Sequence, residues 1–231
     1  MLRSRTEYVL EDFRLTLHAY STPLAVAAIP ERGPFIIPWL RDLFLVALAV
    51  LLLAALAQIS FDVPFSTGRS GEIVPITGQT FGVLLIGVTL GSRRSVPTIF
   101  AYLATGGLGA PFFAGGASGL SALFTGATAG YLWGFIPAVL FAGWLTERGL
   151  DRGPWLLAGM ALSNALIYVV GLPVLALWLE NNSVDVSVWD AGLWPFIPGD
   201  LAKLTAAAVA VPAAWTAVER FGPRTSRAWH D

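Results

Sequence analysis

The stretch PFIPGDLAKLTAAAVAVPAAW, residues 195–215, decides the class of this protein, because it is long and apolar and yet carries two opposite charges. About 20 apolar residues suffice for a helix to cross the ~30 Å hydrocarbon core of a bilayer. Asp200 and Lys203 stand one helical turn apart within this stretch, and Lys203 is the only lysine in the sequence. Charged groups inside a membrane span are costly and usually face a cavity or a partner. The stretch therefore predicts a membrane helix that carries a polar feature.

The composition of the whole chain agrees with a membrane protein. Of its 231 residues, 55% are hydrophobic and 13% are charged, whereas soluble domains average about 25% charged residues. The formal net charge of −1 provides no basic field that would attract nucleic acid. Because the chain has no cysteine, it can form neither a disulfide nor a thiolate metal site. We expect an integral protein of the lipid bilayer that binds no nucleic acid.

Apolar segments recur along the chain and predict an all-α integral membrane protein with six transmembrane helices. The predicted spans are residues 43–61, 76–90, 95–108, 128–146, 155–179 and 195–218. The second and third spans are shorter and richer in glycine, so either of them could be tilted or partly re-entrant. Three regions follow from these bounds: an N-terminal cytoplasmic or interfacial extension (1–38), the membrane domain (39–222) and a C-terminal tail (223–231).

The distribution of arginine predicts the orientation of the spans. Connections 2–3 and 4–5 and the C-terminal tail together carry seven arginines: Arg93, Arg94, Arg148, Arg152, Arg220, Arg224 and Arg227. The other three connections carry one arginine, Arg69, and the fifth holds Glu180, Asp185 and Asp190. Because positive residues stay on the cytoplasmic side, both termini are predicted to be cytoplasmic and the tail to extend into the cytoplasm.

With this orientation, nearly all polar side chains within the spans lie near the midplane or in the outer half of the membrane. They include Thr77, Gln79, Thr80, Tyr102, Thr128, Tyr131, Asn164, Tyr168, Asp200 and Lys203. One interpretation is a water-accessible pocket open to the outer side. The other is that Asp200 and Lys203 form a structural ion pair, with the lysine reaching outward along its aliphatic stem, while the remaining groups bond one helix to another.

The connection between the third and fourth spans is unusual, because residues 106–126 are rich in glycine and carry no charge. A flexible linker exposed to water does not fit this connection, because it contains the large apolar residues Phe112, Phe113, Leu120 and Phe124. Irregular backbone at membrane depth is tolerated where it lines a cavity. We therefore expect this connection to fold back as a lid over an outward-facing pocket.

Several kinds of chemistry are excluded by the sequence. The lysine follows Ala202, so the chain has no Gly-Lys-Ser/Thr sequence for a nucleotide-binding P-loop. The segment Gly116-Ala117-Ser118-Gly119 matches a short pattern of intramembrane serine proteases, but the two histidines, His18 and His230, lie outside the predicted spans. The prediction is a protein that is not an enzyme and that carries no cofactor or metal.

Six segments in order resemble the BioY family, the biotin-binding substrate (S) components of energy-coupling-factor (ECF) transporters. They are VPITGQTFGVLL (74–85), LGSRR (90–94), GAPFFAGG (109–116), GYLWGF (130–135), YVVGLP (168–173) and PFIPGDLAK (195–203), and the likeness also includes the pair Tyr102-Leu103. The likeness covers roughly residues 43–220 and implies six helices with a ligand pocket near the outer surface. It also implies the cell membrane of a prokaryote as the location.

The resemblance implies biotin uptake from outside, powered by an ECF transmembrane coupling subunit and ATP-binding cassette ATPases. Together with the depth argument for Asn164, it gives the candidate biotin-binding residues Gln79, Tyr102, Gly115, Gly116, Asn164, Tyr168, Asp200 and Lys203. Which end of biotin Asp200 and Lys203 contact stays open. Two other functions also stay open: an ion-coupled secondary transporter of a small vitamin-like solute, in which Asp200 titrates, and a membrane scaffold that transports nothing.

Overall fold

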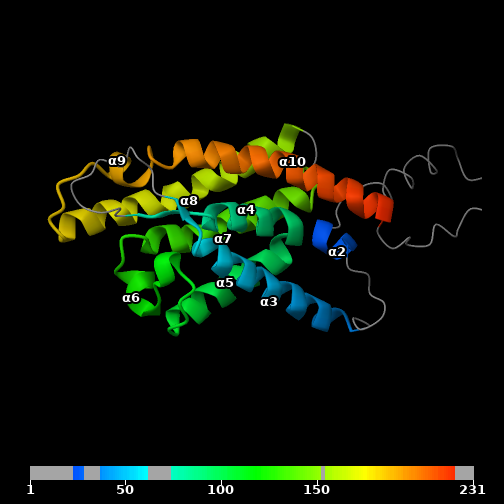
Figure 1. Cartoon of the computed structure of the whole chain (residues 1–231), viewed down its shortest axis with the longest axis horizontal. Helices are drawn as coiled ribbons and strands as arrows, with labels where there is room; N and C mark the ends of the chain where they lie inside the picture. The colour runs from blue at the N-terminus through cyan, green and yellow to red at the C-terminus, as the bar shows by residue number, and fades with distance from the viewer. Residues whose placement is uncertain (1–22, 29–36, 62–73, 152–153, 222–231) are drawn as a thin grey trace, which may run out of the picture.

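The computed structural model describes residues 23–28, 37–61, 74–151 and 154–221, which form a bundle of helices (Figure 1). The longer helices are α3 (Pro38–Ala57), α4 (Gln79–Leu90), α5 (Ser92–Gly107), α7 (Ala129–Thr146), α8 (Pro154–Asn181) and α10 (Ile197–Phe221). The short elements are α2 (Leu24–Ala28), β1 (Ser60–Phe61), β2 (Ile76–Thr77), the 3₁₀ turn η2 (Ala114–Gly116), α6 (Gly119–Phe124) and α9 (Val188–Gly192). The two strands pair antiparallel, with Ser60 opposite Thr77.

Each predicted span overlaps one of the longer helices, but the first was predicted to run to residue 61, whereas α3 ends at Ala57 and Ser60–Phe61 form β1. By length and hydropathy, four described stretches could cross a membrane: Pro38–Ala57, Ala129–Thr146, Trp155–Asn181 and Val188–Val218. Helix α4 is apolar but has 12 residues, and α5 begins with two arginines, Arg93 and Arg94. The helical class is confirmed, whereas the count of six spans stays a prediction.

Helix α7 lies at the centre of the bundle and packs against α4, α5 and α8 (Figure 1). Its glycines allow this close approach. A Cβ atom at Gly134 would lie 2.9 Å from the carbonyl oxygen of Ile167 on α8, and one at Gly143 would overlap the backbone of Ser92 on α5. Apolar lipid provides no hydrophobic driving force for helix association, so membrane helices associate through close packing, and small residues allow that close approach.

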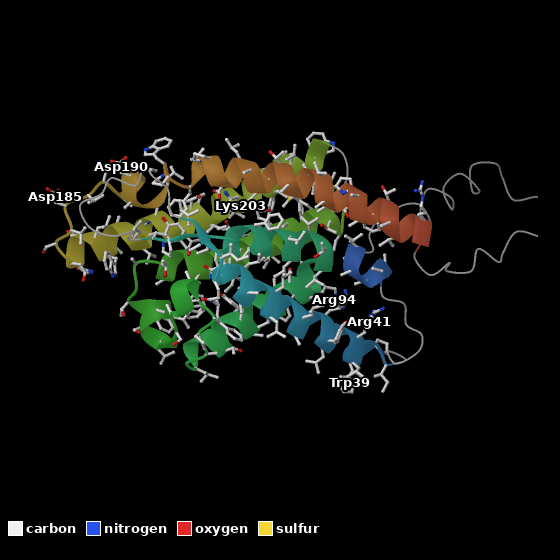
Figure 2. All side chains as sticks on the ribbon, viewed as in Figure 1. Trp39, Arg41, Arg94, Asp185, Asp190 and Lys203 are labelled. Carbon is white, nitrogen blue, oxygen red and sulfur yellow. The ribbon has the colours of Figure 1, made fainter. Side chains whose placement is uncertain are left out.

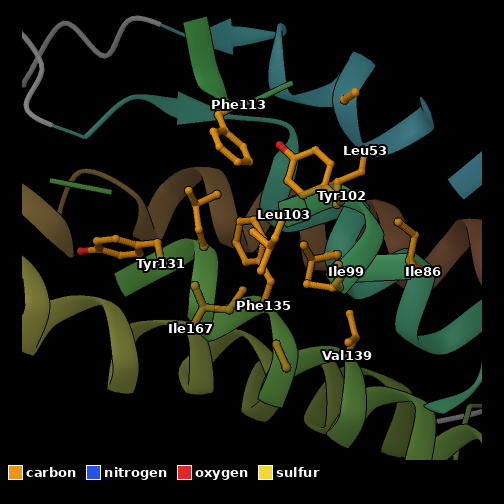
Figure 3. Close-up of a cluster of buried hydrophobic side chains, with 14 of the residues drawn as sticks. Leu53, Ile86, Ile99, Tyr102, Leu103, Phe113, Tyr131, Phe135, Val139 and Ile167 are labelled. Carbon is orange, nitrogen blue, oxygen red and sulfur yellow. The ribbon is translucent and has the colours of Figure 1, made fainter. Parts of the chain in front are cut away.

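The apolar core lies between these central helices. Figure 3 shows buried side chains meeting there from α3, α4, α5, α7 and α8, together with Phe113 from the segment before η2. Helix α10 contributes much less: in the stretch Val188–Val218, which includes most of α10, 17% of an 18-residue apolar segment is buried, against 61% for α7. It packs along α4 and α8 at the edge of the bundle.

Parts of the predicted extension and tail fall outside the described residues. This applies to residues 1–22 and 29–36 of the extension and to the C-terminal tail 223–231. Within the predicted extension, α2 packs against α4 and α10, and its Leu24 is buried.

Candidate ligand-binding site

A cavity of about 240 Å³ lies where the first turns of α4 and α7 meet the middle of α8 and the start of α10. Its lining combines polar side chains with aromatic and aliphatic ones. The lining residues are Val74, Pro75, Thr77, Gln79, Thr80, Phe113, Ala114, Ala117, Ala127, Thr128, Tyr131, Leu132, Phe135, Ile167, Tyr168, Phe196 and Lys203. An apolar pocket with a few convergent polar groups is typical of a small-molecule site.

Lys203 supplies the cationic group of this lining. Its Nζ donates a hydrogen bond to Thr80 Oγ1 on α4 at 2.8 Å and lies 3.4 Å from Asp200 Oδ1, one turn earlier on α10. In Figure 2 the residue lies well inside the bundle, between the two ends of the helices. The long lysine side chain therefore reaches across from α10 to α4 and presents its ammonium group to the cavity.

Asp200 lies behind the cavity wall and is 5% exposed. Its Oδ2 accepts hydrogen bonds from Asn164 Nδ2 at 2.7 Å and from the Tyr168 hydroxyl at 2.5 Å, both on α8, while Oδ1 faces Lys203. A buried carboxylate is tolerated when it is paired and hydrogen-bonded in this way. Asp200 thus neutralises Lys203 and fixes α10 to α8, while the ring of Tyr168 faces the cavity.

Gln79, the first residue of α4, begins a second polar chain. Its Oε1 accepts a hydrogen bond from Thr77 Oγ1 at 3.1 Å, and its Nε2 donates to the Tyr102 hydroxyl at 2.6 Å. Tyr102 is fully buried on α5 and donates in turn to the carbonyl oxygen of Phe112 at 2.8 Å. Gln79 therefore faces the cavity with a fixed amide, while Tyr102 connects that amide to the glycine-rich segment.

Aromatic rings form much of the remaining wall. The rings of Tyr131 and Tyr168 meet edge to face, with 6.1 Å between centroids. Phe196 meets Tyr168 in a similar way at 6.5 Å, and Phe113 closes the side formed by the glycine-rich segment. Aromatic walls of this kind can enclose an apolar ring of a ligand, while polar groups such as those of Gln79 and Lys203 orient the ligand.

Gly115 and Gly116 belong to η2 and do not line the cavity themselves. Their φ angles of 64° and 76° lie in the left-handed region that glycine adopts without strain. Because of this backbone bend, their neighbours Ala114 and Ala117 both face the cavity. Their part in the site is to shape the turn.

The eight residues predicted from the sequence fall into three groups around one cavity. Gln79, Tyr168 and Lys203 line it. Tyr102 bonds to Gln79, Asp200 bonds to Tyr168 and Lys203, and Asn164 bonds to Asp200, while Gly115 and Gly116 bend the adjacent turn. Sequence reasoning did not select several lining residues, namely Thr80, Tyr131, Phe135 and Phe196. The predicted depth of Tyr131 in its span could have indicated it. The contact of Thr80 with Lys203 depends on how α4 and α10 are rotated about their axes, which the sequence pattern does not give.

Known proteins similar to this chain include biotin transporters. The chain is 37% identical over 174 residues to the biotin transporter BioY of Rhodobacter capsulatus, which covers 71% of this chain and 87% of that protein. It is 34% identical over 177 residues to the biotin transporter BioY of Rhizobium etli, covering 73% and 90%.

A solved structure shares the fold. The crystal structure of the S-component for biotin from an ECF-type ABC transporter superposes with a TM-score of 0.63 at 22% sequence identity, covering 78% of this chain and 93% of that one. The sequence profile of the BioY family matches residues 24–220, so this protein belongs to the BioY family.

Proposed function

We propose that this protein captures biotin at the outer side of the membrane and delivers it inward as the substrate-specific subunit of an ECF-type ABC transporter. The observation that carries the proposal is the cavity, whose lining combines the side chain of Lys203 with aromatic rings and the fixed amide of Gln79. Membership of a family whose named relatives are biotin transporters supports the choice of ligand. Those relatives are transporters, in agreement with the expectation that the chain is not an enzyme.

In the proposed complex, Lys203 binds the carboxylate of biotin. A charge-assisted hydrogen bond in a site without bulk water is roughly twice as strong as a neutral one. Asp200 already accepts from Asn164 and Tyr168, so these neutral donors share the stabilisation of its charge. Lys203 can then pair with the ligand without leaving Asp200 unsatisfied.

The ureido ring is proposed to lie near Gln79. A ureido group has two N–H donors and one carbonyl acceptor, and a glutamine amide offers the complementary acceptor and donor. Gln79 uses one hydrogen of Nε2 for Tyr102 and accepts from Thr77, which leaves one donor and one acceptor position available. The aromatic wall formed by Phe113, Tyr168 and Phe196 would enclose the apolar part of the ligand.

We propose that six helices cross the plasma membrane of a prokaryote, with both termini cytoplasmic. The distribution of charge supports this orientation: Asp185 and Asp190 lie at one end of the bundle, while Arg41 and Arg94 lie toward the other (Figure 2). The positive-inside rule makes the arginine end cytoplasmic. The cavity then opens toward the outer side, with the glycine-rich segment as its lid.

Energy would come from separate proteins. Because the sequence contains no P-loop, ATP hydrolysis is assigned to ATP-binding cassette ATPases that act through a membrane coupling subunit. No cofactor is assigned to this chain. The bundle itself would supply specificity through its cavity.

Radiolabelled biotin uptake in a biotin-auxotrophic cell tests this function. We expect uptake when the chain is produced with its energising subunits, and its loss when Lys203→Met and Asp200→Asn are combined. Dissipating the proton gradient while ATP is maintained should leave uptake intact. If uptake collapsed with the gradient, the ion-coupled transporter would be the better description, and a chain that binds no biotin would favour the scaffold.

A further inference from the structure

The cavity is closed on one side by residues 111–117, which we call the cover segment. Phe113, Ala114 and Ala117 of this segment line the cavity. The turn is closed by its own backbone, because Phe113 N donates to Ala117 O at 3.0 Å and Gly116 N donates to Phe113 O at 3.1 Å. These bonds make the turn a unit that moves together.

The ring of Phe113 anchors the cover segment to α5. It is 2% exposed and packs edge to face on Tyr102, with 5.5 Å between ring centroids (Figure 3). The ring lies directly on Gly106, where any Cβ atom would overlap it. The closed position of the cover segment therefore depends on the packing of the Phe113 ring against Gly106 and Tyr102.

Three consecutive carbonyl groups of the cover segment accept hydrogen bonds from side chains outside it. The Tyr102 hydroxyl donates to Phe112 O at 2.8 Å, whereas Gln58 Nε2 lies 3.1 Å from Phe113 O and 3.4 Å from Pro111 O. Gln58 is the residue that follows the last turn of α3. The segment is therefore held from two different helices.

The two attachments differ in how easily they can be released. Tyr102 is fully buried and bonded on both sides, so freeing it would leave polar groups unsatisfied in the core. Gln58 is exposed, and its bonds to the cover segment are longer. Water can replace these bonds at little cost, so the Gln58 attachment is the one that opens first.

We infer that Gln58 is a positioning residue that keeps the cover segment closed and thereby sets how fast ligand enters and leaves, without contacting the ligand. Gln58 does not line the cavity; it acts on Phe113 through the backbone. The effect on biotin rests on the proposed function, but the closing of the segment does not. The test therefore has one arm without ligand and one arm with it.

The arm without ligand uses the absence of cysteine in the natural chain. A Thr128→Cys variant places one thiol on the half-buried cavity wall, and the rate of its reaction with a water-soluble maleimide reports opening. Gln58→Met keeps the side-chain length but removes the donor. We expect about 2- to 10-fold faster labelling, since the two long bonds to Pro111 O and Phe113 O together count for about one typical net hydrogen bond. Gln58→Lys, which restores a donor, should label close to the rate of Thr128→Cys alone.

Asn182→Ala is the matched control. Asn182 is also exposed and donates from its side-chain amide to a backbone carbonyl, that of Trp178 at 2.8 Å, within its own helix end. Its loss removes a bond of the same kind without touching the cover segment, so labelling should not change. The inference would be overturned if Gln58→Met labelled at the same rate as Thr128→Cys alone. It would also be overturned if Asn182→Ala accelerated labelling as much as Gln58→Met does.

The second arm measures biotin dissociation in the cysteine-free chain. Gln58→Met should release biotin about 2- to 10-fold faster, with Gln58→Lys and Asn182→Ala unchanged. Faster labelling combined with unchanged dissociation would refute the role of Gln58 in ligand retention. If no variant bound biotin, the proposed function would fail, while the labelling rates would still decide whether Gln58 closes the cover segment.

Discussion

Replacing Lys203 with methionine separates the two roles that this side chain has in the proposed site. Methionine keeps much of the length and removes the charge, so the contacts of Nζ with Thr80 at 2.8 Å and Asp200 at 3.4 Å are both lost. A hydrogen bond to a charged group contributes about 1.5–3 kcal/mol. We therefore expect the dissociation constant for biotin to rise about 10- to 150-fold, because ~1.4 kcal/mol corresponds to a factor of ten.

The same substitution should also lower stability, which would confuse any test based on activity alone. Breaking a buried ion pair by removing one partner costs about 3–5 kcal/mol when nothing else satisfies the remaining charge. Asp200 keeps its bonds from Asn164 and Tyr168, so we expect a smaller loss. The double variant Lys203→Met, Asp200→Asn removes both charges and should regain most of the lost melting temperature.

Biotin affinity must not recover in that double variant if Lys203 contacts the ligand. The assay is isothermal titration calorimetry on purified protein, with melting curves recorded on the same samples without ligand. Restored stability with weak binding supports a ligand contact by the ammonium group. Restored stability together with affinity equal to that of the natural chain would refute it, and Asp200 and Lys203 would then be a structural pair.

Two further predictions concern the contacts around α10. Tyr168→Phe removes one of the two neutral donors to the buried Asp200 carboxylate, so we expect the free energy of unfolding to fall by about 1–3 kcal/mol and biotin binding to weaken, as measured by denaturation and calorimetry. Trp215→Phe removes the donor to Asp151 Oδ2 at 2.9 Å; because Trp215 lies about 18 Å along the helix from Lys203, it should lower the melting temperature and leave biotin affinity unchanged.

The helices were predictable because a backbone buried in lipid has no water to bond with, so its N–H and C=O groups must bond to one another. An uncharged apolar stretch such as residues 43–57 of α3 has to form its hydrogen bonds internally, and a helix does this locally. The same reasoning gave the depth of Gln79 and Tyr168, because rise along a helix is fixed at about 1.5 Å per residue. Depth alone brought both residues to the level of one cavity.

Rotation about the helix axis could not be predicted in the same way. Asp200 and Lys203 are three residues apart and share a face, yet Asp200 turns to α8 and Lys203 reaches α4. Which neighbour each one meets depends on the packing of whole helices, including glycine contacts such as Gly134 against α8. The roles of Tyr102 and Thr80 depend on the same rotations, so no local pattern indicates them.

The position of the site between tightly and loosely packed helices has a consequence for binding. Helix α10 is largely exposed along its length, and its described polar links to the rest of the bundle near the cavity are those of Asp200 and Lys203. A ligand held by Lys203 on α10 and Gln79 on α4 would add a link between α4 and this less buried helix. Because a ligand shifts a conformational equilibrium by its difference in affinity for the two states, biotin should favour the arrangement in which α10 lies against α4. Lys203, whose charge Asp200 neutralises in the empty protein, would then be the residue through which the ligand fixes this helix.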